Sequence, residues 1–151
     1  MATKVTDTLY LFYHGPFSQW HPCTFVYEAV QYNCAEQAMM AAKAKLFGDL
    51  EILAQTLATA DPREQKALGR KVRNFEPAKW KEVCRQLVTE INFCKFSQNH
   101  ELKAELLNTG DRIIAEASPR DRVWGIGVGV NNPLAHATHA QLSTPQRRRK
   151  Q

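Results

Sequence analysis

The sequence lacks any long hydrophobic segment. No run of about eighteen apolar residues occurs in it, and a membrane-spanning helix needs about that length. Residues 1–8 are polar and have neither the basic nor the apolar region of a secretory signal peptide. We therefore expect a protein that has no membrane partner and stays in the cytoplasm, with the nucleus as the alternative.

Cysteine is sparse, and its spacing excludes two common kinds of site. The four cysteines, at 23, 34, 84 and 94, are separated by 11, 50 and 10 residues. This spacing matches neither a C-x-x-C metal motif nor a dense disulfide framework, so we predict reduced thiols. The histidines are also scattered, and the pair His136 and His139 has no further ligand nearby. We predict no metal site and no cofactor.

Acidic residues are absent after Asp121, whereas five basic residues follow it. The net charge of +5 therefore arises near the C-terminal end, and residues 1–121 carry 15 charges of each sign. The basic run 147–150 could contact a phosphate backbone or act as an import signal, but such a run is more often a solvated terminus. We predict a disordered basic tail at 143–151.

A length of 151 residues and a hydrophobic content of 44% indicate one globular domain. Aromatic-rich segments at 8–13 and 24–27 predict strands, and a third strand is expected at 112–116. Capping residues and apolar repeats predict helices at 35–47, 49–59, 61–70, 78–96 and 99–108. We therefore predict an α+β fold, mainly helical with a small β-sheet, formed by residues 9–142 after a short tail at 1–8.

Glu116 to Gly127 combines groups that are typical of a binding site. It holds the carboxylates of Glu116 and Asp121, and the indole of Trp124 precedes a glycine-rich turn. Backbone next to glycine can approach a ligand closely, an indole offers a stacking surface, and a carboxylate can support charge development. A strand that ends in a tight turn, with Trp124 in the core, would explain the same pattern.

Four segments, taken in order, resemble one known family. They are Phe-Ser-Gln-Trp at 17–20, the segment 32–43 that begins Tyr-Asn-Cys-Ala-Glu-Gln, Gly69-Arg70, and 116–127. The series is similar to the motifs of the NADAR superfamily, the YbiA-like N-glycosidases, from about Leu11 to about Pro133. The resemblance implies hydrolysis of an N-glycosidic bond between a ribose that carries phosphate or ADP and a nitrogenous base.

This reaction needs a carboxylate that activates water or attacks directly, and stabilisation of an oxocarbenium-like ribose. Glu36 is the expected principal catalytic carboxylate. A capping box with Asn33 as the N-cap, or a surface partner such as Lys43, is the alternative. Asp121 is the expected second catalytic or ribose-binding carboxylate, and an Asx cap after Pro119 or an ion pair with a neighbouring arginine is its alternative.

The other candidates are expected to bind the substrate. The spacing of Tyr32, Glu36 and Lys43 predicts one shared helical face. Lys43 suits a phosphate as a point charge, and the fork of Arg70 suits a pyrophosphate.

Trp20 and Trp124 are expected to sandwich a flat base, with core packing as the alternative for each. Glu116 is expected to bind a ribose hydroxyl. Further substrate contacts are expected from Phe17, Ser18, Gln19, Ser118 and Gly125.

The sequence departs from the family pattern at two places. Gln19 stands where the family commonly has Asn before the aromatic residue. Beyond Pro133 the chain lacks the Leu-Met pair and final Arg that often end the family's terminal helix, so no role of that helix is carried over.

The resemblance implies two substrate classes for an N-glycosidase. One is ADP-ribose attached to guanine in DNA or nucleosides, and the other is a phosphorylated intermediate of riboflavin synthesis. The basic tail favours the first, because cations that neutralise backbone phosphates add affinity for a nucleic acid. A module that senses NAD or ADP-ribose without turnover is the alternative of another class, and it would tolerate Glu36→Gln. A structural or interaction domain is the third possibility.

Overall fold

The computed structural model of the protein describes residues 3–121, 123–129 and 131. The chain divides into two compact units, one formed by residues 1–18 with 105–151 and the other by residues 19–104. Five helices and two small sheets are found in the described residues. The predicted α+β, mainly helical fold is confirmed, with two sheets in place of one.

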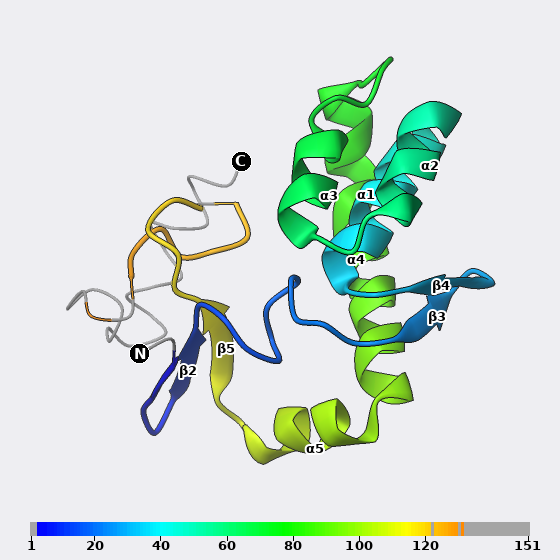
Figure 1. Ribbon diagram of the computed structural model, residues 1–151. Coiled ribbons are helices and arrows are strands. Elements are labelled where there is room, and N and C mark those ends of the chain that lie inside the picture. The colour runs from blue at the N-terminus through cyan, green and yellow to red at the C-terminus, as the bar shows by residue number, and fades with distance from the viewer. Residues whose placement is uncertain (1–2, 122, 130, 132–151) are drawn as a thin grey trace. The chain divides into compact units, whose positions relative to one another are not determined.

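The unit formed by 1–18 and 105–151 contains a three-stranded sheet in the order β1-β2-β5. Its strands are β1 (Thr3–Val5), β2 (Leu9–Phe12) and β5 (Ile113–Glu116). β2 is antiparallel to β1 and parallel to β5, so two segments that are far apart in the sequence lie side by side (Figure 1). β1 occupies part of the segment that the sequence indicates as a tail.

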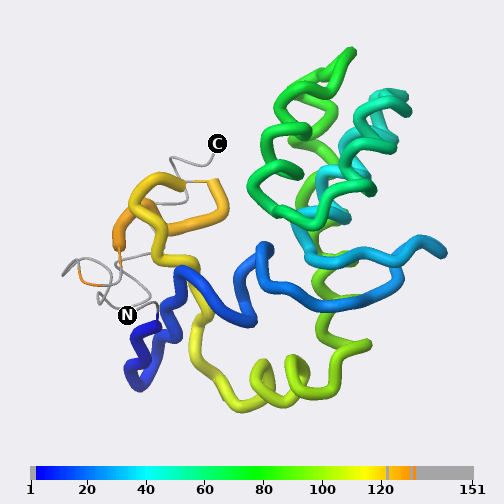
Figure 2. Tube along the Cα trace, viewed as in Figure 1, coloured from blue at the N-terminus to red at the C-terminus, as the bar shows by residue number. Residues whose placement is uncertain are grey.

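The unit formed by 19–104 is mainly helical. Its elements are the hairpin of β3 (Phe25–Tyr27) and β4 (Val30–Tyr32), the helices α1 (Ala35–Leu46), α2 (Leu50–Ala58), α3 (Pro62–Gly69) and α4 (Pro77–Gln98), and the start of α5 (His100–Asn108). The tube in Figure 2 shows the hairpin leading directly into α1. The helices agree with the predicted ones within a few residues at each end, whereas β4 was not predicted.

α1 is the central helix of its unit and contacts α2, α3 and α4. Its alanines at 35, 38, 41 and 44 are all fully buried, and their spacing places small side chains on more than one side of the helix. Small side chains let neighbouring elements approach closely. The aromatic residues of the β3-β4 hairpin and Ile91 of α4 pack with the first part of α1, which forms the largest core cluster.

The N-terminus of α1 is capped differently from the prediction. Cys34, not Asn33, is the N-cap, and its Sγ accepts a hydrogen bond from the Gln37 N–H at 3.4 Å. The Gln37 Oε1 in turn accepts from the Asn33 N–H at 2.8 Å. A thiol is a weak acceptor, so sequence reasoning favoured the asparagine. Gln37 therefore fills the capping-box role that the sequence left open for Glu36.

Asp49 links the start of α2 to the segment after α3. Its Oδ1 accepts from the Ile52 N–H at 3.1 Å and from Nη2 of Arg73 at 2.8 Å. Its Oδ2 accepts from the Arg73 backbone N–H at 2.8 Å. The hydrogen bonds from Arg73 hold the pKa of the Asp49 carboxyl well below its usual range.

Asp49→Asn should therefore lower the stability of the protein at neutral pH. A folded-state pKa below the unfolded value of about 3.9 gives stability that is present above that pH and is lost as the pH falls below it. Urea unfolding at pH 7 and near pH 2 should show a gap between wild type and Asp49→Asn that narrows in acid. Asp111→Asn, at an exposed position, is the control. A gap of equal size at both pH values would contradict this account.

Candidate active site

The predicted site residues fall into two groups, one in each unit of the chain. The unit 19–104 holds Gln19, Trp20, Tyr32, Glu36, Lys43 and Arg70. The other unit holds Phe17, Ser18, Glu116, Ser118, Asp121, Trp124 and Gly125. Each group contains at least one carboxylate and one tryptophan.

Glu36, Lys43 and Arg70 form a cluster of charges. Glu36 lies in the first turn of α1 and is only 7% exposed. Burial lowers the pKa of the Lys43 amine, while the Glu36 carboxylate opposes this shift and the Arg70 guanidinium adds to it. Both residues therefore lie close enough to Lys43 to act on its charge. The shared role of Glu36, Lys43 and Arg70 in substrate binding stays a prediction.

Two aromatic rings hold the Lys43 ammonium group. Its Nζ lies 4.4 Å from the centroid of the Phe75 ring and 5.9 Å from that of Trp80. Such cation–π contacts fix the position of an ammonium group without neutralising it. Phe75 was not predicted as a site residue, because only the fold brings the segment after α3 to this lysine.

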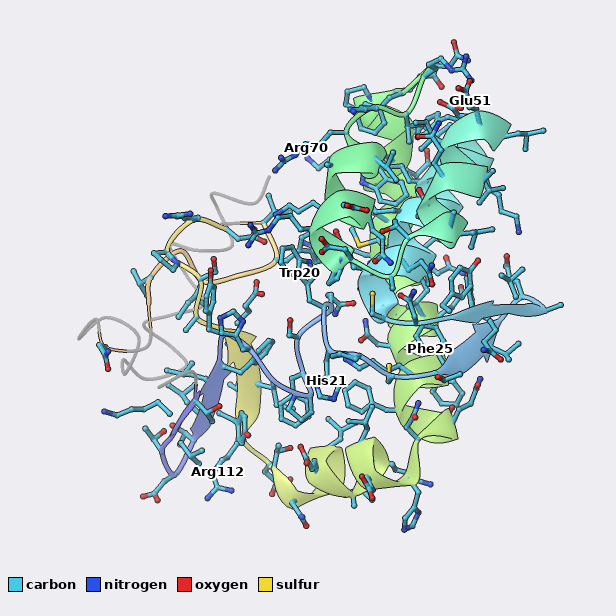
Figure 3. All side chains as sticks on the ribbon, viewed as in Figure 1. Trp20, His21, Phe25, Glu51, Arg70 and Arg112 are labelled. Carbon is cyan, nitrogen blue, oxygen red and sulfur yellow. The ribbon has the colours of Figure 1, made fainter. Side chains whose placement is uncertain are left out.

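The close contact between α3 and α1 determines where Arg70 lies. A Cβ atom at Gly69 would collide with Sδ of Met40, so the two helices meet directly at this glycine. Arg70 follows as the C-cap of α3 and is exposed. Its side chain extends away from the helices in Figure 3.

The loop before β3 is tied to the start of α1. The backbone oxygen of Gln19 accepts a hydrogen bond from the Glu36 N–H at 2.9 Å. The side-chain amide of Gln19 exchanges two hydrogen bonds with that of Asn92 on α4, at 3.3 and 3.4 Å. Trp20 is half-buried, and Nζ of Lys66 on α3 lies 6.0 Å from its ring centroid. Asn92 and Lys66 were missed by sequence reasoning.

A buried polar network holds the N-terminus of α1 against α2 and α3. Oε1 of Gln65 accepts from the Cys34 thiol at 3.1 Å, and Nε2 of Gln65 donates to the Thr59 carbonyl at 2.8 Å. Nε2 of Gln37 donates to the Thr56 carbonyl at 3.2 Å. Burial raises the pKa of the Cys34 thiol to about 11, so it is protonated at neutral pH. Cys34 thus caps α1 and packs against Gln65 of α3.

The predicted position of Tyr32 on the helical face was wrong. Tyr32 ends β4, and α1 begins only after Cys34, so helical spacing does not apply to it. The residue is 4% exposed, and its ring centroid lies 6.0 Å from that of Phe25. The shared helix therefore carries Glu36 and Lys43 alone.

The glycine-rich loop folds back onto the end of β5. The Ile126 N–H donates to the Glu116 carbonyl at 2.9 Å. A Cβ atom at Gly125 would lie 2.8 Å from the Asp121 carbonyl oxygen and 3.1 Å from both Oε2 of Glu116 and Cβ of Ser118. Only glycine fits such a close approach without a shift of the backbone. The loop thereby brings Glu116, Ser118, Asp121 and Gly125 together.

Asp121 caps the turn that follows it. Its Oδ1 accepts from the N–H groups of Val123 and Trp124, both at 2.9 Å. This is the Asx-type role that the sequence left open, while the arginine at position 122 lies outside the described residues. Trp124 is 40% exposed, so its alternative role as a core residue was wrong.

Phe17 and Ser18 are both buried in their unit. The Phe17 ring packs edge-on against Tyr10, at 5.1 Å between centroids, and against Phe12 at 6.0 Å. Phe17 therefore has a packing role on β2, and its contact with substrate stays a prediction.

The described residues contain no helix that is long and apolar enough to cross a membrane. In the same part of the chain, no three His, Cys, Asp or Glu side chains gather into a metal site. The pair His136 and His139 and the basic run 147–150 lie outside the described residues.

Comparison with known proteins identifies the family. Residues 11–145 match the NADAR domain. The chain belongs to the NADAR family. The resemblance drawn from the four motifs is thus confirmed.

Several relatives in this family carry names that describe their activity. The chain is 44% identical over 133 residues to an N-glycosidase of Acanthamoeba polyphaga mimivirus, with 79% of this chain and 78% of that protein covered. An N-glycosidase of Nostoc punctiforme is 31% identical over 114 residues, with 76% and 73% covered. A riboflavin biosynthesis protein of Vibrio vulnificus is 27% identical over 114 residues, but only 30% of its length is covered.

A solved structure of this NADAR fold supports the architecture. The NMR structure of the Escherichia coli protein YbiA superposes with a TM-score of 0.71, covering 84% of this chain and 77% of that one at 24% identity. At this identity the likeness shows the fold, and the predicted YbiA-like fold is confirmed.

Proposed function

We propose that the protein is an N-glycosidase that releases ADP-ribose from ADP-ribosylated guanine, with Glu36 as the principal catalytic carboxylate. One observation carries the proposal: Glu36 is 7% exposed and acts on the charge of Lys43, while Gln37 makes the capping-box contact at the start of α1. Two relatives named as N-glycosidases support the reaction class.

The proposed reaction is hydrolysis at the anomeric carbon of the ADP-ribose. The bond from this carbon to the guanine nitrogen breaks, and the base keeps the electron pair and takes up a proton. Water forms the new bond to the anomeric carbon and gives a proton to the Glu36 carboxylate. A buried carboxylate also stabilises the positive charge that develops on the ribose in the transition state.

Lys43 and Arg70 are proposed to bind the diphosphate of the substrate. The ammonium group of Lys43 is fixed by the rings of Phe75 and Trp80, which suits a single anionic oxygen. Arg70 is exposed at the end of α3 and can offer two parallel N–H donors. Trp20 is proposed to stack on a flat ring of the substrate.

The residues around the glycine loop are proposed to act in the same reaction. Asp121 is the candidate second carboxylate, although its Oδ1 already caps the turn to Trp124. Trp124, at 40% exposure, offers an open ring face. Ribose and backbone contacts are proposed for Glu116, Ser118 and Gly125, and further substrate contacts for Phe17, Ser18, Gln19 and Tyr32.

A second substrate is favoured by the similarity to the Vibrio vulnificus riboflavin biosynthesis protein. It is a phosphorylated riboflavin intermediate, in which a ribose phosphate is joined to a pyrimidine nitrogen. Its single phosphate would leave one of the two cations, Lys43 or Arg70, without an anionic partner. We therefore expect a higher kcat/KM for ADP-ribosylguanosine when both substrates are assayed side by side. A higher value for the riboflavin intermediate would reverse the assignment within the same reaction class.

A sensor of NAD or ADP-ribose without turnover is the alternative of another class. Calorimetric titration with ADP-ribosylguanosine, followed by mass analysis of the same sample, separates the two functions. Binding with release of ADP-ribose supports the N-glycosidase. Binding of an unchanged ligand would support the sensor.

A further inference from the structure

Three cations form a stripe along α3, and the proposed reaction uses only one of them, Arg70. Arg63, Lys66 and Arg70 occupy positions i, i+3 and i+7, and all three are exposed. At 100° per residue this spacing places the three side chains on one face of the helix. We refer to Arg63, Lys66 and Arg70 as the basic stripe.

Carboxylates near the basic stripe are engaged elsewhere. Oδ1 of Asp61 accepts from the Arg63 backbone N–H at 2.9 Å, which caps the helix. Oε2 of Glu64 accepts from the Thr59 hydroxyl at 2.6 Å. Arg73, which follows α3, forms ion pairs with Asp49 and Glu51. Both carboxylates, those of Asp61 and Glu64, keep their negative charge and lie at the start of α3, while the three cations share one face of the helix.

Arg63 stands where a helix disfavours a cation. It is the second residue of α3, in the first turn, where the helix dipole favours acidic side chains. A residue that opposes its local structure without a compensating contact commonly has a functional role. Arg63 belongs to none of the family motifs and lies two turns before Arg70.

The basic stripe adjoins the candidate site. Nζ of Lys66 lies 6.0 Å from the Trp20 ring centroid, and Arg70 acts on the charge of Lys43. Trp20 and Arg70 both lie along the edge of α3 that is turned away from α2 in Figure 3. The stripe thus runs along α3 from Arg70, which acts on the charge of Lys43, past Lys66 and the Trp20 ring, to Arg63 in the first turn of the helix.

We propose that the basic stripe binds the phosphate backbone of a single nucleic-acid strand that carries the modified guanine. Seven residues of helix span about 10 Å, so the three side chains can reach more than one phosphate of the same strand. Alternating cations and an aromatic ring are the groups with which proteins hold single strands, and enzymes that act on a base take it out of the duplex stack. This inference rests on the proposed N-glycosidase function.

The test compares a strand with a nucleoside as substrate. Arg63→Glu should raise the KM for a single-stranded DNA oligonucleotide with one ADP-ribosylated guanine by about tenfold or more, because it removes one phosphate contact and adds repulsion. It should leave kcat/KM for ADP-ribosylguanosine unchanged. For Arg63→Ala, the logarithm of the binding constant for the oligonucleotide should fall less steeply with the logarithm of the salt concentration, and the slope should be smaller by about 1.

Lys103→Glu is the matched control. Lys103 is also an exposed cation, but it lies on α5 and is not part of the basic stripe. It should change neither substrate's kinetics. Equal losses on both substrates for Arg63→Glu would overturn the inference, because the stripe would then bind the diphosphate of ADP-ribose itself. No loss on either substrate would overturn it too and make the stripe a solvated face.

A binding measurement keeps the inference separate from the proposed chemistry. If wild-type protein releases nothing from either substrate, the N-glycosidase proposal fails. Fluorescence anisotropy with an unmodified single-stranded oligonucleotide still tests the stripe. Salt-dependent binding that Arg63→Glu weakens and Lys103→Glu does not would support the stripe, and equal binding by all three proteins would overturn it.

Discussion

Glu36→Gln is expected to stop the release of ADP-ribose from ADP-ribosylguanosine while the substrate still binds. Glutamine has nearly the same shape as glutamate, but it cannot accept a proton from water or stabilise a positive charge on the ribose. Loss of a general base typically lowers the rate by about 10²–10⁴-fold. We expect kcat to fall in this range, measured by mass analysis of released ADP-ribose, with a dissociation constant close to that of wild type by calorimetry.

Glu82→Gln provides the matched control, because it makes the same chemical change on an exposed position of α4. Its kcat should equal that of wild type. If Glu36→Gln kept the wild-type kcat, Glu36 would not be the catalytic carboxylate. The buried charge cluster would then have a binding role only.

Gly69→Ala is expected to destabilise the protein, although alanine is otherwise the better helix former. The new Cβ would collide with Sδ of Met40, which packs directly on Gly69. Added volume in a well-packed core typically costs about 1–3 kcal/mol. Urea unfolding should show this loss. Activity should fall as well, because Arg70 follows Gly69 and its position depends on the close approach of α3 to α1.

Two further variants test whether the collision with Met40 causes the loss of stability. Gly129→Ala is the control, since a Cβ there meets no atom within 4 Å, and its stability should match that of wild type. Met40→Ala creates a cavity and should cost about 2–5 kcal/mol alone. In the double variant Gly69→Ala/Met40→Ala, no sulfur atom is left for the new Cβ to collide with. The loss in free energy of unfolding should therefore be clearly smaller than the sum of the losses in the two single variants. Strictly additive losses would contradict a collision at Gly69.

The sequence predicted the helices well because each has a local signal. Asp61 is the N-cap of α3, as its position before Pro62 indicated, and Asp49, which was predicted as the first residue of its helix, is the N-cap of α2. β1 and β4 were missed because neither segment is rich in aromatic residues, whereas the equally short β3 was predicted from Phe25 and Tyr27. Tyr32 was misplaced for the same reason, since a short unpredicted strand ends at it.

The charge cluster shows what sequence alone could and could not supply. Glu36 and Lys43 share α1, so helical spacing was enough to associate them. Arg70 came from the family resemblance, and its association with Lys43 depends on the contact of α3 with α1. Phe75 and Lys66 carry no local signal, because each becomes part of the site through a tertiary contact.

The basic stripe follows from the sequence by helical spacing, since Arg63, Lys66 and Arg70 lie three and four residues apart. Arg63 lies two residues after Asp61, the N-cap of α3. The structure shows that this aspartate bonds the backbone N–H of Arg63.

The most direct test of the central claim is to incubate the wild-type protein with ADP-ribosylguanosine and to determine the masses of both products. Hydrolysis of the N-glycosidic bond predicts intact ADP-ribose and unmodified guanosine in equal amounts. AMP together with a phosphoribosyl group still attached to guanosine would show cleavage of the diphosphate instead. That result, or unchanged substrate in a sample where binding is complete, would contradict the assignment of this protein as an N-glycosidase for ADP-ribosylated guanine.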